Sequence, residues 1–524
     1  MKTNIRTLLA ASTAALLLGA AACTDITTEP KSTVTEANIF NDPSSYQAFL
    51  AKLYGGYSLT GQQGPAGNGD IQLIDEGFSN YLRQLWQLEE LPTDEAVIAW
   101  GDAGLPELNT QLWGPANQFL GAMYYRIFVQ VSLANEFLRQ STDAKLASRN
   151  ASPALVAQVH QFRAEARFLR ALSYWHGIDL FGDIPLVTEN DEAGATAPKQ
   201  STRQAVYDYT VSELNAIRTE LPAIGQAEYG RADQGAVQML LAKLYLNSAV
   251  YTGTARNAEA LAAVQAVIAS GQYAIDPSYQ HLFLADNHTS PEIIFPIPFD
   301  GVHTQSYGGT TFLVHAAVGG NMNAANFGID GGWYGLRTRP EVYNLYAAGD
   351  HRNGIFYTNG QSASINSISN FNDGPGAPKY RNVTSGGQPG SNSTFPDTDY
   401  PMFRLGDAYL MYAEAVLRGG GGTRAQALAY VNALRQRAYG DASGNITDAQ
   451  LTLDFLKNER ARELIWEGHR RTDLIRFGAF TTSGIWEWKG GVKPGKLTEA
   501  FRNLYPIPAS ELQANPNLKQ NAGY

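Results

Sequence analysis

Apolar residues at helical spacing recur along most of the chain, and this periodicity limits the possible fold classes more than any other feature. No run of alternating apolar and polar residues approaches these segments in length, so the pattern predicts a mainly helical protein. The first helix should begin at Asp42-Pro43, because Asp is a good N-cap and Pro suits a first turn. Further helices are predicted over residues 114–140, 152–180, 202–219, 232–251, 256–270, 404–418, 424–438 and 449–476.

Two pairs of these predicted helices are separated only by short glycine-containing turns. Residues 232–270 hold one pair, rich in alanine, and residues 404–438 hold another around the glycine run 419–422. Hairpins of this size, with small residues where helices approach closely, are typical of tetratricopeptide repeats. The predicted fold is therefore all-α, a scaffold of tetratricopeptide-like helix pairs. Residues 162–180 carry two overlapping apolar stripes, so this helix should be covered on more than one side.

Two long segments break the helical pattern. Residues 273–400 are dominated by Gly, Asn, Ser and Pro with interspersed aromatic residues, and residues 60–112 are similarly irregular. A connection of more than 100 residues is too long to be passive and is more often functional. We therefore expect a large, irregular, loop-rich ligand face carried by the helical scaffold.

The N-terminus has the pattern of a secretion signal. Lys2 and Arg6 precede an apolar run, Leu8–Leu18, and small residues lead to Cys23, the single cysteine of the chain. The run is too short for a permanent membrane span. The junction resembles the lipobox of bacterial lipoproteins, although Ala20 stands where Leu is usual. A plain cleaved signal with an incidental Cys23 is the alternative.

These features divide the chain into three parts. Residues 1–22 are predicted to be a lipoprotein signal peptide, with lipidation at Cys23. Residues 23–41 are polar and Thr-rich, so they are expected to tether the protein to the membrane. Residues 42–524 form the predicted folded domain, with the ligand-face segments 60–112 and 273–400 inside it.

Charge and motifs exclude several functions. The formal net charge of −10 and the pI near 5.4 provide no basic surface for nucleic acid. The eight histidines show no spacing typical of a zinc site, and neither a P-loop nor a GxSxG motif is present. The sequence thus identifies no cofactor and no metal ligand. A structural calcium ion stays open, because oxygen ligands alone suffice for one; the residues considered are Asp70, Asp75 and Glu76, or Asp94 and Glu95.

Three carboxylates at i, i+4 spacing, Glu459, Glu463 and Glu467, invite a comparison with the paired acids of a hydrolase. Arg462, Arg470 and Arg471 lie three or four residues from these acids, the spacing of helical salt bridges. We therefore predict a structural ion network and assign no catalytic residue.

Several sequence blocks resemble the SusD-like (RagB/SusD) family of nutrient-binding outer-membrane lipoproteins. The helix FRAEARFLRALSYWHGIDLFGDIPLV from Phe162 resembles the hallmark of that family. Later blocks are similar in the same order; they begin at Gly230, Tyr400, Asn458 and Leu504. The last one has Ala522 where Pro is common. The resemblance extends over essentially the whole mature chain.

The resemblance implies a function and a partner. It implies about four tetratricopeptide-like helix pairs beneath a variable ligand face, and non-catalytic capture of a nutrient at the cell exterior. It also implies an outer-membrane location and delivery of the ligand to a SusC-like, TonB-dependent transporter. A glycan is the best-known ligand of the family. Two alternatives stay open: a secreted glycoside hydrolase on a helical fold, and a tetratricopeptide scaffold for protein interactions.

Aromatic residues in the irregular segments are the candidates for ligand contact. A pyranose packs its C–H face on Trp or Tyr, while its hydroxyls need polar partners. The candidates combine a ring, neighbouring glycines and a polar side chain; they are Trp100, Asp102, Tyr307, Trp333, Tyr334 and Arg337. The alternative for each ring is that it fills the scaffold beneath it. Trp86, within an apolar run, is expected in the core.

Overall fold

The structure, a computed structural model, describes residues 39–524 except 41, 66, 192, 193, 195 and 196. The predicted signal peptide, Cys23 and nearly all of the predicted tether lie outside the described residues. The chain divides into two units, residues 1–45 and 46–524, and the second contains both segments predicted to form the ligand face. Among the described residues, none of the helices combines the length and the apolar character that a membrane crossing requires.

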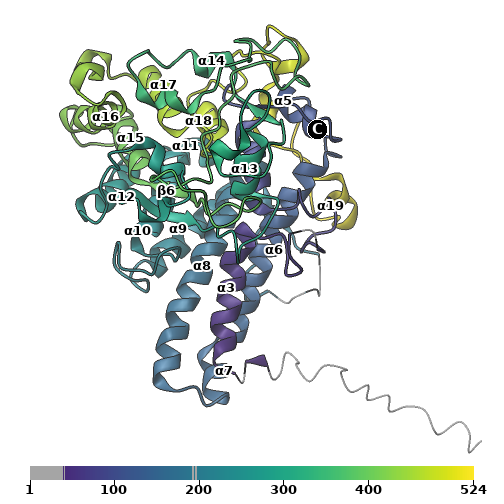
Figure 1. Ribbon diagram of the computed structural model, residues 1–524. Coiled ribbons are helices and arrows are strands. Elements are labelled where there is room, and N and C mark those ends of the chain that lie inside the picture. The colour runs from purple at the N-terminus through teal and green to yellow at the C-terminus, as the bar shows by residue number, and fades with distance from the viewer. Residues whose placement is uncertain (1–38, 41, 66, 192–193, 195–196) are drawn as a thin grey trace, which may run out of the picture. The chain divides into compact units, whose positions relative to one another are not determined.

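Helices make up most of the regular structure (Figure 1), as the apolar periodicity predicts. Their bounds are α3 (Ser44–Ser58), α4 (Tyr81–Glu90), α5 (Leu105–Thr110), α6 (Gln118–Gln140), α7 (Asp143–Ser148), α8 (Pro153–Phe181), α9 (Arg203–Ile217), α10 (Gln234–Leu246), α11 (Ser248–Thr252), α12 (Asn257–Ala269), α13 (Gly309–Ala316), α14 (Pro340–Tyr343), α15 (Leu405–Leu417), α16 (Arg424–Tyr439), α17 (Leu453–Leu464), α18 (Arg470–Arg476) and α19 (Ala509–Ala514).

The strands are short and pair two by two. They are β1 (Val97–Ile98) with β5 (Leu336–Arg337), β2 (Ile184–Pro185) with β3 (Gln200–Ser201), and β4 (Ile293–Ile297) with β6 (Tyr400–Arg404), all antiparallel. Short 3₁₀ helices lie between these elements: η1 (Tyr279–Phe283), η2 (Asn287–Thr289), η3 (Ala324–Phe327), η4 (His351–Ile355), η5 (Ala442–Gly444), η6 (Asp448–Gln450), η7 (Lys489–Gly491) and η8 (Ala500–Asn503).

The two predicted helix pairs are present and stack on each other. Helix α10 packs against α12, and α15 packs against α16. Helix α12 also packs against α15, although residues 270–404 separate them in the chain. Figure 1 shows these four helices in succession. The predicted scaffold of helix pairs is therefore confirmed, and the long irregular segment leaves it and returns to it at one place.

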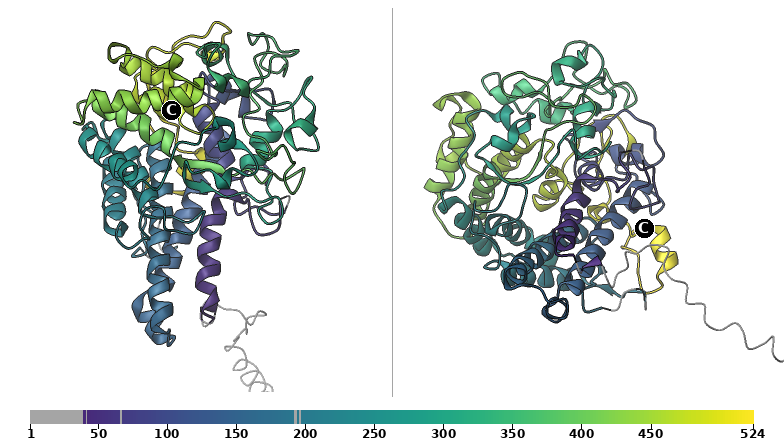
Figure 2. Two further views of the ribbon diagram at one scale, coloured as in Figure 1. Left: turned by 60° about the vertical axis from the view of Figure 1, so that its left-hand side comes forward. Right: turned by 60° about the horizontal axis from the view of Figure 1, so that its bottom comes forward.

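Helix α8 is the long central helix of the scaffold. Ser152 caps its start by accepting a hydrogen bond from the Leu155 amide, and Pro153 occupies the first turn. Helix α6 runs beside α8 (Figure 2), and α9 packs against α8 as well. Every residue of α8 from Phe168 to Phe181 is buried. This agrees with the two apolar stripes predicted to be covered on more than one side.

The predicted helix over 449–476 is wrong as a single element. It is split into α17 and α18 by a turn in which Trp466 has a left-handed backbone with φ of 63°. The main-chain amide and the indole nitrogen of Trp466 both donate to Glu95, each at 3.0 Å. The Trp86 indole donates to the Trp466 carbonyl oxygen at 2.9 Å. These tertiary hydrogen bonds take the place of helical ones, and apolar periodicity gives no sign of them. Trp86 itself is fully buried, as predicted.

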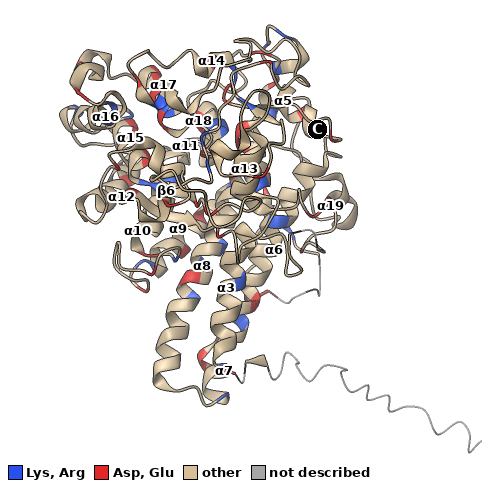
Figure 3. Cartoon of the chain, viewed as in Figure 1, with Lys and Arg blue, Asp and Glu red and all other residues tan. Residues whose placement is uncertain are grey.

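The predicted ion network is confirmed. Figure 3 shows charged residues of both signs at α17 and α18, and those that form the network are buried. Glu459 pairs with Arg462 and Arg435, each at 2.7 Å, and with Arg352 at 3.0 Å. Glu463 pairs with Arg352 and Arg404, each at 2.8 Å. Neither carboxylate has exposed surface, so neither is available to a substrate.

The predicted partners of Glu467 are wrong. Glu467 lies beyond the end of α17 and pairs with Lys379 at 2.7 Å and with Arg404 at 2.6 Å. Arg470 pairs with Asp94, and Arg471 pairs with Asp179. The turn at Trp466 removes the i, i+4 geometry on which the prediction relied, and the partners come from distant segments.

Candidate ligand-binding site

The two irregular segments meet at the β1–β5 pair. Val97 lies opposite Arg337 and Ile98 lies opposite Leu336, and the Ala99 amide donates to the Gly335 oxygen at 2.9 Å. Trp100 closely follows β1, and Trp333 shortly precedes β5. The pairing therefore brings together two tryptophans that are far apart in sequence.

A cavity of about 410 Å³ opens beside these tryptophans. Four of the six predicted site residues line it: Trp100, Asp102, Tyr307 and Trp333. The other lining residues are Asp75, Glu76, Gly77, Phe78 and Arg83. A cavity of this volume, with several rings and a few polar groups, is typical of a small-molecule or oligosaccharide site.

The three rings form a continuous aromatic surface. The Trp100 and Trp333 ring centroids lie 6.3 Å apart, and those of Trp333 and Tyr307 are also 6.3 Å apart. The Trp100 indole nitrogen donates to the Trp333 carbonyl oxygen at 3.0 Å. Because this hydrogen bond uses the only polar atom of that ring, Trp100 offers a ligand an apolar, fixed surface. We call Trp100, Trp333 and Tyr307 the aromatic arc.

His315, near the end of α13, supports the middle ring of the arc. Its imidazole stacks on Trp333 with centroids 4.7 Å apart, and the Trp333 amide donates to the His315 carbonyl oxygen at 2.8 Å. The imidazole is buried and its nitrogens lie 2.6 Å and 2.9 Å from the carbonyl oxygens of Gly331 and Thr394. Burial lowers the pKa of His315, against the effect of those two carbonyls. One face of Trp333 is thus covered by the protein.

Arg83 of α4 is a functional candidate that the sequence analysis missed. Its guanidinium lies 4.2 Å from the Phe78 ring centroid and 5.6 Å from that of Trp100. It donates to the carbonyl oxygens of Gly77 and Tyr307 at 3.0 Å and 3.1 Å. Burial lowers the pKa of Arg83 to about 9, and nearby carboxylates oppose that shift. Arg83 is therefore a cation at neutral pH, held at the wall of the cavity. The signal in the sequence is a charged residue within the apolar run around Trp86.

The cavity offers a ligand two exposed carboxylates, Asp75 and Asp102. Asp75 is fixed, because it accepts a hydrogen bond from the Gly77 amide at 2.9 Å. Asp102 and Asp75 are both exposed, so their oxygens are accessible to a ligand. Carboxylates and a guanidinium around an apolar surface match the hydroxyls and C–H faces of a neutral saccharide.

Two predicted site residues do not line the cavity. Tyr334 is 53% exposed, but its ring packs edge-on against Phe371, with centroids 5.5 Å apart. Arg337 has no exposed surface, and its guanidinium donates to main-chain oxygens of Asp373, Ile368 and Asn370. A side chain without exposed surface has nothing to offer a ligand. Arg337 is therefore a correction to the sequence prediction: it is a structural residue that holds the loop 368–373.

The acids considered for calcium are engaged in other contacts or line the cavity. Asp70 pairs with Lys52 at 2.7 Å, and Asp94 pairs with Arg470 at 2.7 Å. Glu95 accepts the Trp466 amide, whereas Asp75 and Glu76 line the cavity. Throughout the described part of the chain, no group of three or more His, Cys, Asp or Glu residues is placed to hold a metal ion.

Comparison with known proteins decides the family. The model of the SusD family matches residues 348–524, and the model of the family described as starch-binding and associating with the outer membrane matches residues 77–246. The starch-binding protein SusD of Bacteroides thetaiotaomicron is 35% identical to this chain, over 91% of this chain and 92% of its own length. The chain belongs to the SusD family. The resemblance predicted from the five sequence blocks is therefore confirmed.

More distant relatives resemble this SusD-family chain in sequence, and solved structures share its fold. A SusD-like protein of Bacteroides ovatus is 23% identical over 94% of this chain and 86% of its own length. Surface glycan-binding protein A from Bacteroides fluxus has a TM-score of 0.71 at 22% identity, covering 94% of this chain and 100% of its own. Surface glycan-binding protein A from Bacteroides thetaiotaomicron, solved with laminarihexaose, has a TM-score of 0.70 at 21% identity, covering 91% of this chain and 98% of its own.

Proposed function

We propose that this SusD-family protein binds a glycan without transforming it, and that the ligand stacks on the aromatic arc. The observation that carries the proposal is the rigid, half-buried surface of Trp100, Trp333 and Tyr307 beside Arg83 and exposed carboxylates. Rings supply area for the C–H faces of sugar units, and the polar groups supply partners for the hydroxyls.

Starch is the glycan to test first. The 35% identical relative is named as a starch-binding protein, whereas the relatives named with laminarin or laminarihexaose are 21–23% identical. The polymer we expect is a neutral glucan, since the cavity holds carboxylates beside a single arginine and would repel a polyanion.

The cellular role extends this proposal. The lipobox-like sequence before Cys23 supports a lipid anchor, and the description of the family matched by residues 77–246 supports an outer-membrane location. We infer that the protein faces the cell exterior and passes its ligand to a SusC-like, TonB-dependent transporter. Co-purification of such a transporter with the tagged protein from detergent-solubilised outer membranes would test that partnership.

The binding proposal is tested by calorimetric titration of maltoheptaose and laminarihexaose into the wild type and the Trp333→Ala variant. Trp333→Ala should weaken binding about tenfold or more, because a stacking ring contributes about 0.5–1.5 kcal/mol beyond its buried area. Tyr334→Ala is the matched control, since that exposed ring lies next in the chain but outside the cavity. Equal affinity of the wild type and Trp333→Ala would refute the site. Release of reducing sugar from starch would instead favour a hydrolase.

A further inference from the structure

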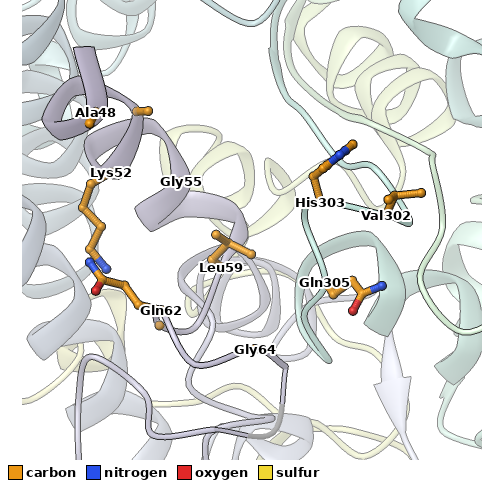
Figure 4. A pocket seen from close by; sticks show the side chains of 11 residues that line it. Ala48, Lys52, Gly55, Leu59, Gln62, Gly64, Val302, His303 and Gln305 are labelled. Carbon is orange, nitrogen blue, oxygen red and sulfur yellow. The ribbon is translucent and has the colours of Figure 1, made fainter. Parts of the chain in front are cut away.

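Three neighbouring cavities lie on or beside α3, apart from the aromatic arc. The first, about 480 Å³, lies between α3 and residues 302–305; Figure 4 shows Lys52, Gly55 and Leu59 on the helix side opposite Val302, His303 and Gln305. The second is about 380 Å³ and the third about 610 Å³. Leu59 lines the first two, Val302 the first and third, and Tyr229 the second and third. The shared residues make the three one extended depression, which we call the α3 groove.

Tyr229 is the ring at the junction of the second and third cavities. It is 45% exposed, yet it is fixed: its hydroxyl donates to the Asp399 carboxylate at 2.5 Å, and its ring lies edge-on to His288 with centroids 6.3 Å apart. Asp399 is buried and also accepts the Phe299 amide at 2.7 Å. Trp100 of the arc is held in the same way, through its own polar atom. A ring fixed before binding loses little entropy when a ligand stacks on it.

The groove around Tyr229 offers both apolar and polar surface. Leu50, Leu59, Phe162 and Pro298 supply apolar walls in the second cavity, and Arg231 and Glu228 lie with them. In the third cavity, the polar groups are mainly oxygens: Asp300, Ser391, Asp397 and Asp399. Oxygen acceptors suit the hydroxyls of a neutral ligand and repel an anionic one. The mixture is of the same kind as in the arc cavity.

One segment of chain links the groove to the arc. Residues 298–305 contribute Pro298, Val302, His303 and Gln305 to the groove, and Tyr307 two residues later belongs to the arc. Arg83 holds this segment by donating to the Tyr307 carbonyl oxygen. The two surfaces are therefore built on a common support.

We propose that the α3 groove is a second saccharide-binding site, with Tyr229 as its stacking ring, for a further stretch of the neutral polysaccharide bound at the arc. This inference rests on the proposed glycan-binding function. Two sites on one protein raise the affinity for a polymer that reaches both, without changing the affinity of a short oligosaccharide for the first site.

The test compares a polymer with a short ligand. Binding of soluble amylopectin is measured by affinity electrophoresis and binding of maltoheptaose by calorimetry, for the wild type, Tyr229→Ala and Val302→Arg. Val302 is 59% exposed, so Val302→Arg obstructs the groove without disturbing the core. Both variants should bind amylopectin at least threefold more weakly and maltoheptaose at the arc as the wild type does. Tyr430→Ala, a partly exposed ring on α16 that does not line the groove, is the control.

The outcomes separate the two proposals. If Trp333→Ala weakens both ligands while Tyr229→Ala and Val302→Arg leave amylopectin binding unchanged, the groove proposal is overturned and the arc stands. If the wild type binds neither ligand nor laminarin, the proposed function fails first. If the groove variants bind amylopectin normally but lose a co-purifying outer-membrane protein, the groove is a protein interface and the proposal is also overturned. A loss of amylopectin binding in Trp333→Ala/Tyr229→Ala beyond that in Trp333→Ala supports it.

Discussion

The Trp100 indole nitrogen donates to the carbonyl oxygen of Trp333 at 3.0 Å, across 233 residues of sequence. This hydrogen bond joins the two irregular segments at the point where a ligand would stack. It fixes the Trp100 ring and, through the backbone, the loop that carries Trp333.

Two variants of Trp100 distinguish the contribution of its ring to ligand binding from that of its hydrogen bond. Trp100→Phe keeps an aromatic surface but removes the donor, so we expect a few-fold loss of maltoheptaose affinity. Trp100→Ala removes both, and the loss should reach about tenfold, equivalent to about 1.4 kcal/mol. Calorimetric titration of both variants measures the difference. If Phe and Ala weaken binding equally, the ring of Trp100 makes no stacking contribution.

Arg83 is expected to act through the geometry of its guanidinium. Arg83→Lys keeps the positive charge but removes the planar guanidinium, which packs against the Phe78 ring while one of its nitrogens, Nη1, donates to both Gly77 and Tyr307. We predict weaker glycan binding with a folded protein, and little change when salt is raised, because the ligand is neutral. Titrations at low and high salt check both points. Wild-type affinity in Arg83→Lys would show that charge alone suffices.

The buried network around Glu459 should make stability depend on acid. Burial by itself raises the pKa of Glu459, but Arg352, Arg462 and Arg435 outweigh it and lower that pKa from 4.5 to about 2. A lowered pKa means that the unfolded state binds the proton first. The ionised Glu459 therefore adds about 3 kcal/mol to the free energy of unfolding. This stabilisation is fully present above about pH 4.5 and is lost as the pH falls toward 2.

Glu459→Gln provides the matched test, since it removes the charge and keeps the shape. It should lower the free energy of unfolding by about 3–5 kcal/mol at pH 7, because buried arginines lose a partner. Urea unfolding at pH 7 and at pH 3 should show a smaller difference between the variant and the wild type at the lower pH. A constant difference would contradict the pKa assignment.

The scaffold and the ligand face should differ in their sensitivity to truncation. Leu169 and Leu240 are buried in α8 and α10, so Leu169→Ala or Leu240→Ala should each cost about 2–5 kcal/mol. His303→Ala, in the exposed part of the ligand face, should cost far less. Chemical denaturation measures all three. Similar losses would contradict the division into scaffold and face.

Lipidation is tested at Cys23. Cys23→Ser removes the sulfur that would carry the acyl chain, and stable anchoring needs such chains. The variant should leave the membrane fraction and lose label from radioactive palmitate, while its glycan binding stays that of the wild type. A variant that remains in the membrane, together with an unlabelled wild type, would disprove the anchor.

Much of the fold was predictable from local sequence. Apolar periodicity located α6, α8 and both helix pairs, because these helices bury a regular stripe. It did not locate the turn at Trp466, whose hydrogen-bond partner Glu95 is 371 residues away. The partners of Glu467 were missed for the same reason.

The candidate site was predictable where chemistry and composition coincide. Trp100, Tyr307 and Trp333 stand out because glycines and polar residues surround them in irregular sequence. Arg337 has the same surroundings, yet it lies in a two-residue strand whose inward direction no local pattern shows. Arg83 was missed because it belongs to a buried helix and reaches the cavity only through the fold.

Helices α12 and α15 pack against each other although one ends at Ala269 and the other begins at Leu405. The excursion between them, residues 270–404, therefore starts and ends at the same place, the contact between these two helices. Closing a longer loop at such a contact costs little, about 0.6 kcal/mol for each doubling of its length. Insertions or deletions in the exposed stretches of this excursion are therefore tolerable to the helices beneath. Arg352 and Lys379 must stay, because they are buried partners of Glu459 and Glu467. Selection for a new sugar, or a designer transferring one specificity to another relative, can therefore vary the exposed loops between these fixed points.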